Sequence, residues 1–193
     1  MCNLILNPTA LAQWHTLFTE AQAYCSSRIE EEIESYVIFM LMRHVNDAQL
    51  ANHVLAVDYL AAAQDSHHSK FNRLRDVGDN CLLVAGLFPQ RADKKLVRIS
   101  YFVNLGQGAY HMLADSGEQA LAALFQHLAE QFVQLMDILQ AMRCVIHDIP
   151  TLTPLQAAEL WSDTRSQQAL SQLKQYTHNI PTGFSEEHKP TAH

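Results

Sequence analysis

The feature that most constrains this chain is the spacing of its apolar residues, which recur every three or four positions along most of its length. Two stripes keep this spacing over several turns: Ile29, Ile33, Tyr36, Val37, Met40 and His44, then Leu121, Phe125, Leu128, Phe132, Leu135, Leu139, Met142 and Ile146. A stripe with this period lies along one face of an amphipathic helix, whereas a half-buried strand alternates polar and apolar residues. The sequence therefore predicts an all-α protein.

Capping residues, prolines and glycines divide this pattern into segments. The segments that we expect to be helical are 9–26, 27–44, 47–64, 66–88, 92–114 and 116–150. The second begins at a capping-box pattern, Ser27 to Glu30, and the last is long enough to bend or break. Short connections favour antiparallel neighbours, so we expect an up-and-down antiparallel bundle of six main helices with a C-terminal helical extension.

The chain changes character after Pro150. Residues 1–150 are expected to form the bundle domain, residues 151–180 an amphipathic helical extension, and residues 181–193 a flexible tail. A Thr153 cap and Pro154 at the first helical position open the extension, and the polar stretch 162–168 predicts two short helices instead of one. The extension either docks on its own bundle or offers an apolar face to a partner protein or a second protomer. The residues of that face are Trp161, Leu170 and Leu173.

Composition excludes several classes of function. The formal charge is −7 and the isoelectric point is near 5.8, which argues against binding to nucleic acid or to an anionic membrane. The densest basic stretch, residues 91–98, lacks the aromatic residues of a platform for single strands. The N-terminus shows no secretory signal, the apolar runs are too short to span a bilayer, and the four cysteines form no CxxC pair. We therefore expect a soluble cytoplasmic protein with reduced thiols.

Glycines mark an unusual place in the predicted bundle. Four of the six glycines lie between positions 78 and 108, within segments that are otherwise helical. A glycine inside a helix costs about 1 kcal/mol relative to alanine, so it needs a packing reason. If the segments 66–88 and 92–114 form an antiparallel hairpin, counting from the turn places Gly78 and Gly106 at the same level on facing helices, with Gly108 nearby. Either the two backbones approach closely there, or the missing side chains open a slot for a flat ligand.

Polar residues gather near the same level. Arg75 and Asp79 are spaced as i,i+4 partners, and Arg73 and Asp76 as i,i+3 partners. Asp58 interrupts the apolar stripe of the third segment, and a buried carboxylate needs a partner. We expect Arg75 to serve Asp58, with a tyrosine such as Tyr101 contributing. The group is either a structural ion pair or part of a ligand site.

The eleven histidines of the chain are candidate ligands for a metal ion or for haem. No HExxH motif or pair of Glu-x-x-His motifs occurs, so we expect no metal site. The histidine of LAQWHTLFTEAQ and the glycines of YFVNLGQGAYHML are similar to the proximal histidine and the glycine-rich kinked helix of haem oxygenases, which are also all-α. This resemblance implies haem as an alternative cofactor, with His15 as its axial ligand and with Gly106 and Gly108 letting the porphyrin approach the backbone.

No nucleophile motif, phosphate-binding loop or dinucleotide fingerprint is present. The sequence therefore favours a non-enzymatic binding protein, an adaptor, chaperone-like or regulatory bundle that acts through protein–protein contacts, as a homodimer, without cofactor or catalytic residues. The alternative is an enzyme or carrier, similar to a haem oxygenase, that binds haem or another small flat ligand in a pocket at the level of Gly78 and Gly106.

Overall fold

The structure, a computed structural model of the chain, describes residues 9–44, 59, 67–94, 96–116, 119–147 and 152–178. Within these ranges the helices are α1 (Ala10–Tyr24), α2 (Glu31–His44), α4 (His67–Leu87), α5 (Gln90–Lys94), α6 (Ile99–Ser116), α7 (Gln119–Glu130), α8 (Phe132–His147), α9 (Pro154–Thr164) and α10 (Gln167–His178). No strand occurs in the described part of the chain, which confirms the all-α prediction. The third expected helix, 47–64, lies outside the described residues except for Tyr59.

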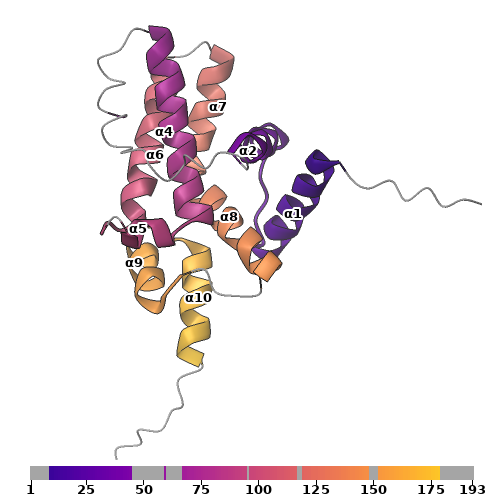
Figure 1. Cartoon of the computed structure of the whole chain (residues 1–193), viewed down its shortest axis with the longest axis vertical. Helices are drawn as coiled ribbons and strands as arrows, with labels where there is room; N and C mark the ends of the chain where they lie inside the picture. The colour runs from indigo at the N-terminus through magenta and orange to yellow at the C-terminus, as the bar shows by residue number, and fades with distance from the viewer. Residues whose placement is uncertain are drawn as a thin grey trace, which may run out of the picture.

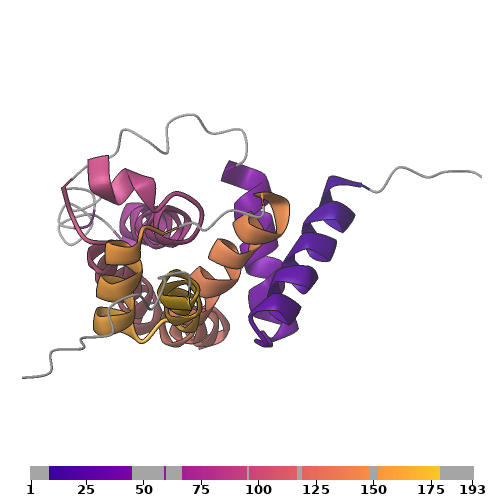
Figure 2. The same cartoon turned by 90° about the horizontal axis from the view of Figure 1, so that it is seen from below.

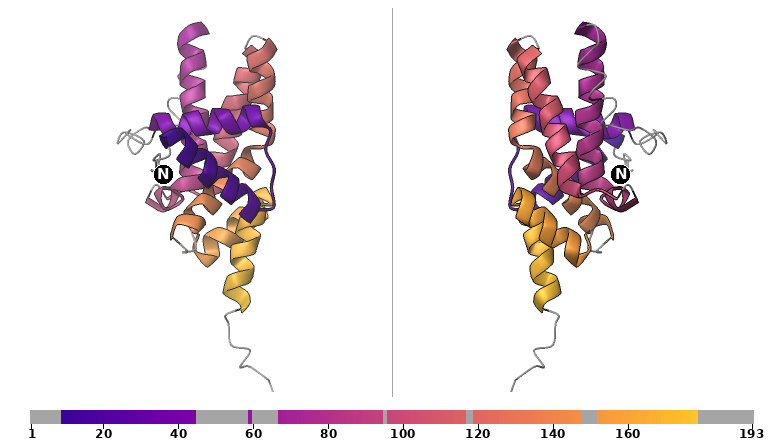
Figure 3. Two further views of the ribbon diagram at one scale, coloured as in Figure 1. Left: turned by 90° about the vertical axis from the view of Figure 1, so that its right-hand side faces the viewer. Right: turned by 90° about the vertical axis from the view of Figure 1, so that its left-hand side faces the viewer.

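The helices α4 and α6 form the central antiparallel pair and pack more extensively on each other than any other two helices do. They stand upright beside α7 in Figure 1, and α8 continues below α7 toward the other end of the molecule. The helix α2 runs across the upright helices, as the left panel of Figure 3 shows, and α1 lies next to α2 on the same flank (Figure 2). The up-and-down arrangement of six helices is therefore not confirmed.

Two predicted helix starts are wrong. Residues 27–30 precede α2 because their polar groups bond outside the helix: the Ile29 N–H donates to Gln22 Oε1 at 2.8 Å, and Ser27 Oγ accepts from Gln134 Nε2 at 2.6 Å. The expected helix over 92–114 is two helices. Leu96 has a φ of 54°, a left-handed conformation that no helix continues through, so α5 ends before it and α6 begins only at Ile99.

The long segment 116–150 breaks at Gln131, which separates α7 from α8. The hydrogen bonds on either side of the break remain helical in pattern: the Gln131 N–H donates to His127 O, and the Leu135 N–H donates to Gln131 O, both at 2.9 Å. The break thus redirects the chain while the N–H and the C=O of Gln131 both keep helical hydrogen-bond partners.

A cluster of aromatic rings forms the centre of the core. The Phe125 ring lies 5.6–6.0 Å, between centroids, from the rings of Phe71, Tyr110 and Tyr36. The Phe132 ring lies 5.9 Å from the ring of Tyr110. These residues come from α2, α4, α6, α7 and α8, so the cluster joins helices that are far apart in the chain. Aliphatic side chains from the same helices surround it, and most of the buried residues in the described part of the chain are apolar.

The residues after Pro150 form two helices, as predicted, and both pack on the rest of the protein at the lower end of Figure 1. The Thr153 cap, its capping box and Pro154 at the helix start are all present in α9. The chain leaves α9 at Arg165, whose φ is 61°. The Tyr176 hydroxyl donates to Leu152 O at 2.8 Å, and the Leu152 N–H donates to Gln172 Oε1 at 3.1 Å, which ties α10 to the start of α9.

The expected partner-binding face of the extension points largely inward. Trp161 and Leu173 are partly buried and pack against the core, and Leu170 is also partly buried. The tail 181–193 lies outside the described residues. None of the helices in the described ranges is both long and apolar enough to cross a membrane.

Candidate functional site

A carboxylate lies at the polar centre of the core. The Asp79 side chain on α4 is completely buried, and three side chains from two other helices satisfy it. The hydroxyls of Tyr36 and Tyr110 both donate to its Oδ1, at 2.7 and 2.8 Å, and the Arg43 guanidinium forms an ion pair with its Oδ2. Because a buried charge without partners is very costly, this network ties α2, α4 and α6 together.

Burial governs the proton affinities in this network. It raises the pKa of Asp79 above the ordinary value, while the hydrogen bonds from Tyr36 and Tyr110 and the charge of Arg43 act in the opposite direction. Burial and the neighbouring carboxylate also raise the pKa of both tyrosines. Both phenols therefore keep their protons and act as hydrogen-bond donors.

The expected partner of Asp79 is wrong. The Arg75 guanidinium lies 3.6 Å from Asp76 Oδ1, and Arg43 from α2 takes the place at Asp79 that the i,i+4 spacing assigned to Arg75. Asp79 points into the core, where a long side chain from a neighbouring helix reaches it, whereas Asp76 faces solvent. Asp58 lies outside the described residues. Tyr101 is 40% exposed and packs against the Phe102 ring instead of joining the polar centre.

The glycines of α4 and α6 lie opposite aromatic rings. A Cβ atom on Gly78 would lie 2.4 Å from the Tyr110 ring, and one on Gly106 would lie 2.5 Å from the Phe132 ring and 2.8 Å from Cys81 Cβ. Gly78 is therefore level with Tyr110, and Gly106 with Cys81, so the two glycines are about one helical turn out of register. The expectation that they face each other is wrong, because the α4–α6 connection is longer than a simple turn and contains α5. Rings occupy the space that the missing side chains leave.

The structure also describes the other two residues of the haem alternative, His15 and Gly108. His15 Nδ1 lies 3.1 Å from Glu34 Oε1, so the structure pairs this imidazole with a carboxylate of α2. The Tyr59 hydroxyl lies 3.1 Å from the position of a Cβ on Gly108.

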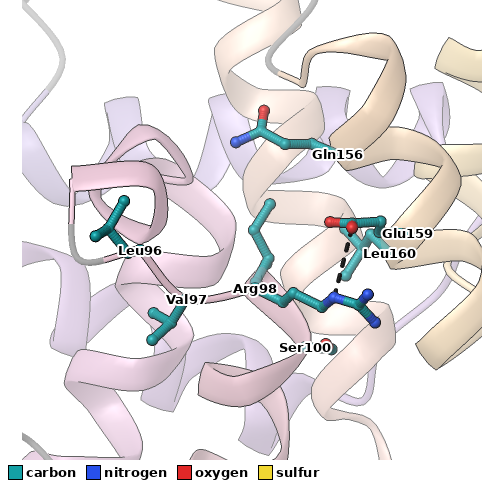
Figure 4. Close-up of a pocket in the computed structure, with 8 residues that line it drawn as sticks. Leu96, Val97, Arg98, Ser100, Gln156, Glu159 and Leu160 are labelled. Atoms are coloured by element: carbon teal, nitrogen blue, oxygen red, sulfur yellow. Dashed lines mark ion pairs between the residues drawn. The ribbon is translucent and has the colours of Figure 1, made fainter.

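A groove runs between the start of α6 and α9, and we call it the Leu96 groove (Figure 4). Its volume is about 380 Å³, and its lining is Leu96, Val97, Arg98, Ile99, Ser100, Gln156, Glu159 and Leu160. The Arg98 Nε atom lies 3.4 Å from Glu159 Oε1 across the groove, as the dashed line in Figure 4 marks. Leu96 stands at the rim and is 94% exposed.

Sequence reasoning missed this groove, because residues 91–98 attract attention only as a basic stretch. A signal was present, since the run of charged residues ends in the apolar pair Leu96 and Val97. Nothing in the spacing, however, indicates that the helix breaks there or that α9 folds back beside it.

A second buried carboxylate, Asp137 on α8, lies where α10 begins. Its Oδ1 accepts from the Ser166 hydroxyl at 2.5 Å, and its Oδ2 accepts from the N–H groups of Gln167 and Gln168 at 2.9 and 3.3 Å. Asp137 therefore caps α10 from another helix. Burial raises its pKa to about 6, although the hydrogen bonds from Ser166, Gln168 and Gln167 act to lower it. A lone charge inside the apolar run LMDIL was the sequence signal for it.

Comparisons of the chain with protein-family models, with curated proteins and with solved structures find no match. The function is therefore inferred from these sites.

Proposed function

We propose that the protein is a non-enzymatic binding protein that acts through protein–protein contacts, and that the Leu96 groove is its contact surface. The observation that supports this is Leu96 itself. A leucine held at a φ of 54° costs about 1–2 kcal/mol of backbone strain, and this one is 94% exposed, so the folded monomer gains little from its side chain. Contact with another molecule would bury it.

The surroundings of Leu96 fit an apolar contact with a polar rim. Val97, Ile99 and Leu160 supply apolar lining, and Leu155, in the first turn of α9 beside the groove, is 69% exposed. Arg98 makes ion pairs with Glu159 and with Asp163, at 3.4 and 3.6 Å, and its side chain is 61% exposed. An apolar centre bordered by charged groups is the usual composition of a protein interface.

The favoured occupant of the groove is a second copy of the chain. One face carries both an apolar projection, Leu96, and an apolar hollow lined by Val97, Ile99 and Leu160. A two-fold axis beside such a face sets the projection of each protomer into the hollow of the other, as an isologous dimer interface requires. The proposed state of the protein is therefore a homodimer in the cytoplasm. Its formal net charge of −7 disfavours nucleic acid as a partner.

The test is the oligomeric state of purified protein, measured by sedimentation velocity over a wide range of concentration. The wild type is expected to dimerise. Leu96→Gly, which removes the side chain and accepts the left-handed backbone, should weaken the dimer at least tenfold while the monomer becomes no less stable. Phe39→Ala is the control, because Phe39 is an exposed apolar residue on α2. A wild type that stays monomeric, or a Leu96→Gly variant that dimerises normally, would contradict the proposal.

A further inference from the structure

Three helix junctions that are distant in the sequence meet at one polar cleft. The α1–α2 junction contributes Tyr24–Arg28, the α7–α8 junction contributes Glu130 and Gln134, and the α9–α10 junction contributes Arg165 and Gln167. The volume of the cleft is about 670 Å³, which lies in the range of small-molecule sites. We call it the junction cleft.

Two arginines from different junctions line the junction cleft, and no carboxylate of the described residues pairs with either of them. Arg28 precedes α2 and Arg165 separates α9 from α10. In the described part of the chain no ion pair involves either guanidinium. The Arg165 guanidinium lies over the Trp161 ring, 5.1 Å from its centroid, so one of its faces is covered while its N–H edge remains available. Each arginine therefore has donors to offer a ligand.

The backbones that carry the two arginines are held in place. The Gln134 side chain donates from Nε2 to Arg28 O at 3.2 Å and to Ser27 Oγ at 2.6 Å, so α8 fixes the α1–α2 junction. The Gln167 side chain donates to Arg165 O at 3.2 Å. Because the backbone at both arginines is already held in place before a ligand binds, binding costs less conformational entropy.

The start of α10 is not the anion-binding element here. Asp137 already accepts from the N–H groups of Gln167 and Gln168, so the positive end of that helix is neutralised. The cleft also holds acceptors and hydroxyls: Glu130 lies on one wall, and Ser26 and Ser171 line the cleft as well. The lining thus combines two guanidinium groups, which no described carboxylate pairs with, and groups that bond hydroxyls.

We propose that the junction cleft binds a small phosphorylated polyol or sugar. The phosphate oxygens accept from Arg28 and Arg165, because a phosphate presents enough oxygens and charge for two guanidinium groups from separate junctions of one cleft. The ligand hydroxyls donate to Glu130 and bond with the serines. This site lies on other elements than the Leu96 groove, and it does not depend on dimer formation.

The test uses glycerol 3-phosphate as the probe and glycerol as its uncharged counterpart, in calorimetric titrations of the full chain. Glycerol 3-phosphate is expected to bind and glycerol is not. Arg28→Gln and Arg165→Gln should each weaken the binding of glycerol 3-phosphate at least tenfold, which corresponds to the loss of one charge-assisted pair. Arg73→Gln, at an exposed arginine of α4, is the matched control and should bind as the wild type does.

Inorganic phosphate is titrated alongside, and we expect it to bind more weakly because it lacks the hydroxyl contacts. Absence of binding by glycerol 3-phosphate would overturn the proposal, and so would equal binding by glycerol or full affinity in either cleft variant. Melting curves of each variant without ligand establish that it is folded, and both arginines are exposed, so we expect the fold to tolerate the substitutions.

Discussion

The two buried carboxylates, Asp79 and Asp137, are satisfied by different kinds of hydrogen-bond partner. Asp79 lies in the middle of the core, and side chains alone satisfy it: two phenols and a guanidinium from α2 and α6. Asp137 lies at the edge of the core, and the backbone of α10 and one hydroxyl satisfy it. The first arrangement specifies how three helices cross. The second attaches one helix to a finished core, so losing it should cost less.

Replacing Asp79 should have the largest effect. Asp79→Ala leaves the Tyr36 and Tyr110 hydroxyls and part of the Arg43 guanidinium buried without an acceptor, and we expect a loss of about 3–5 kcal/mol in the free energy of unfolding. Urea denaturation measures it. Asp76→Ala, three residues earlier on α4 and half exposed, is the control and should change stability by less than about 0.5 kcal/mol. Equal losses in the free energy of unfolding of the two variants would show that the Asp79 network does not contribute to stability beyond an exposed carboxylate.

The pH dependence of stability sharpens the comparison. The pKa of Asp137 in the folded protein, about 6, lies above its ordinary value of 3.8, so the folded state holds this proton more tightly than the unfolded state. Stability from this group is fully present below pH 3.8 and is lost as the pH rises through 6, by up to about 3 kcal/mol.

Asp137→Asn does not titrate, so its unfolding free energy should vary less between pH 4 and pH 7 than that of the wild type. Asp79 also has a raised pKa, and its share of the slope persists in this variant. Unfolding curves at several pH values give both slopes. Parallel slopes for the variant and the wild type would contradict the raised pKa of Asp137.

The smallest effect on stability is expected at Gly78, which packs against the ring of Tyr110, a hydrogen-bond donor to Asp79. A methyl group on Gly78 would lie 2.4 Å from the fully buried Tyr110 ring, which has no room to move, so Gly78→Ala should lose about 1–2 kcal/mol although alanine favours the helix. Gly108→Ala is the matched control. It meets only the hydroxyl end of Tyr59, at 3.1 Å, and should leave stability unchanged or raise it by up to about 1 kcal/mol. Thermal unfolding compares the two, and a stabilised Gly78→Ala would refute the close packing.

Local signals allowed the helices to be predicted better than their contacts. Thr153 with Pro154, and the polar stretch before α10, act over a few residues and predicted the C-terminal helices well. Gly78 was correctly identified as needing a packing reason. Its partner is Tyr110, however, and counting residues from an assumed turn could not allow for α5 or for the left-handed Leu96.

The two candidate sites were harder to predict, because both depend on residues that only the fold brings together. Arg75 is the nearest arginine to Asp79 on the same helix, but the side chain of Arg43 reaches in from α2, and no spacing rule connects positions 43 and 79. The junction cleft likewise joins Arg28 with Arg165. Each helix junction can be predicted from its local sequence, whereas the way in which the junctions come together depends on tertiary packing.

The capping of α10 by a residue of α8 decides the order in which the molecule should come apart. If α10 swings away, Asp137 meets water together with the N–H groups that it served, so no charge is stranded in an apolar interior. If α2 leaves, Asp79 loses the Arg43 guanidinium and the Tyr36 hydroxyl, and of its three side-chain partners only the Tyr110 hydroxyl of α6 remains. Shortening the chain from its C-terminal side should therefore yield a smaller folded protein, and loss of α2 should not.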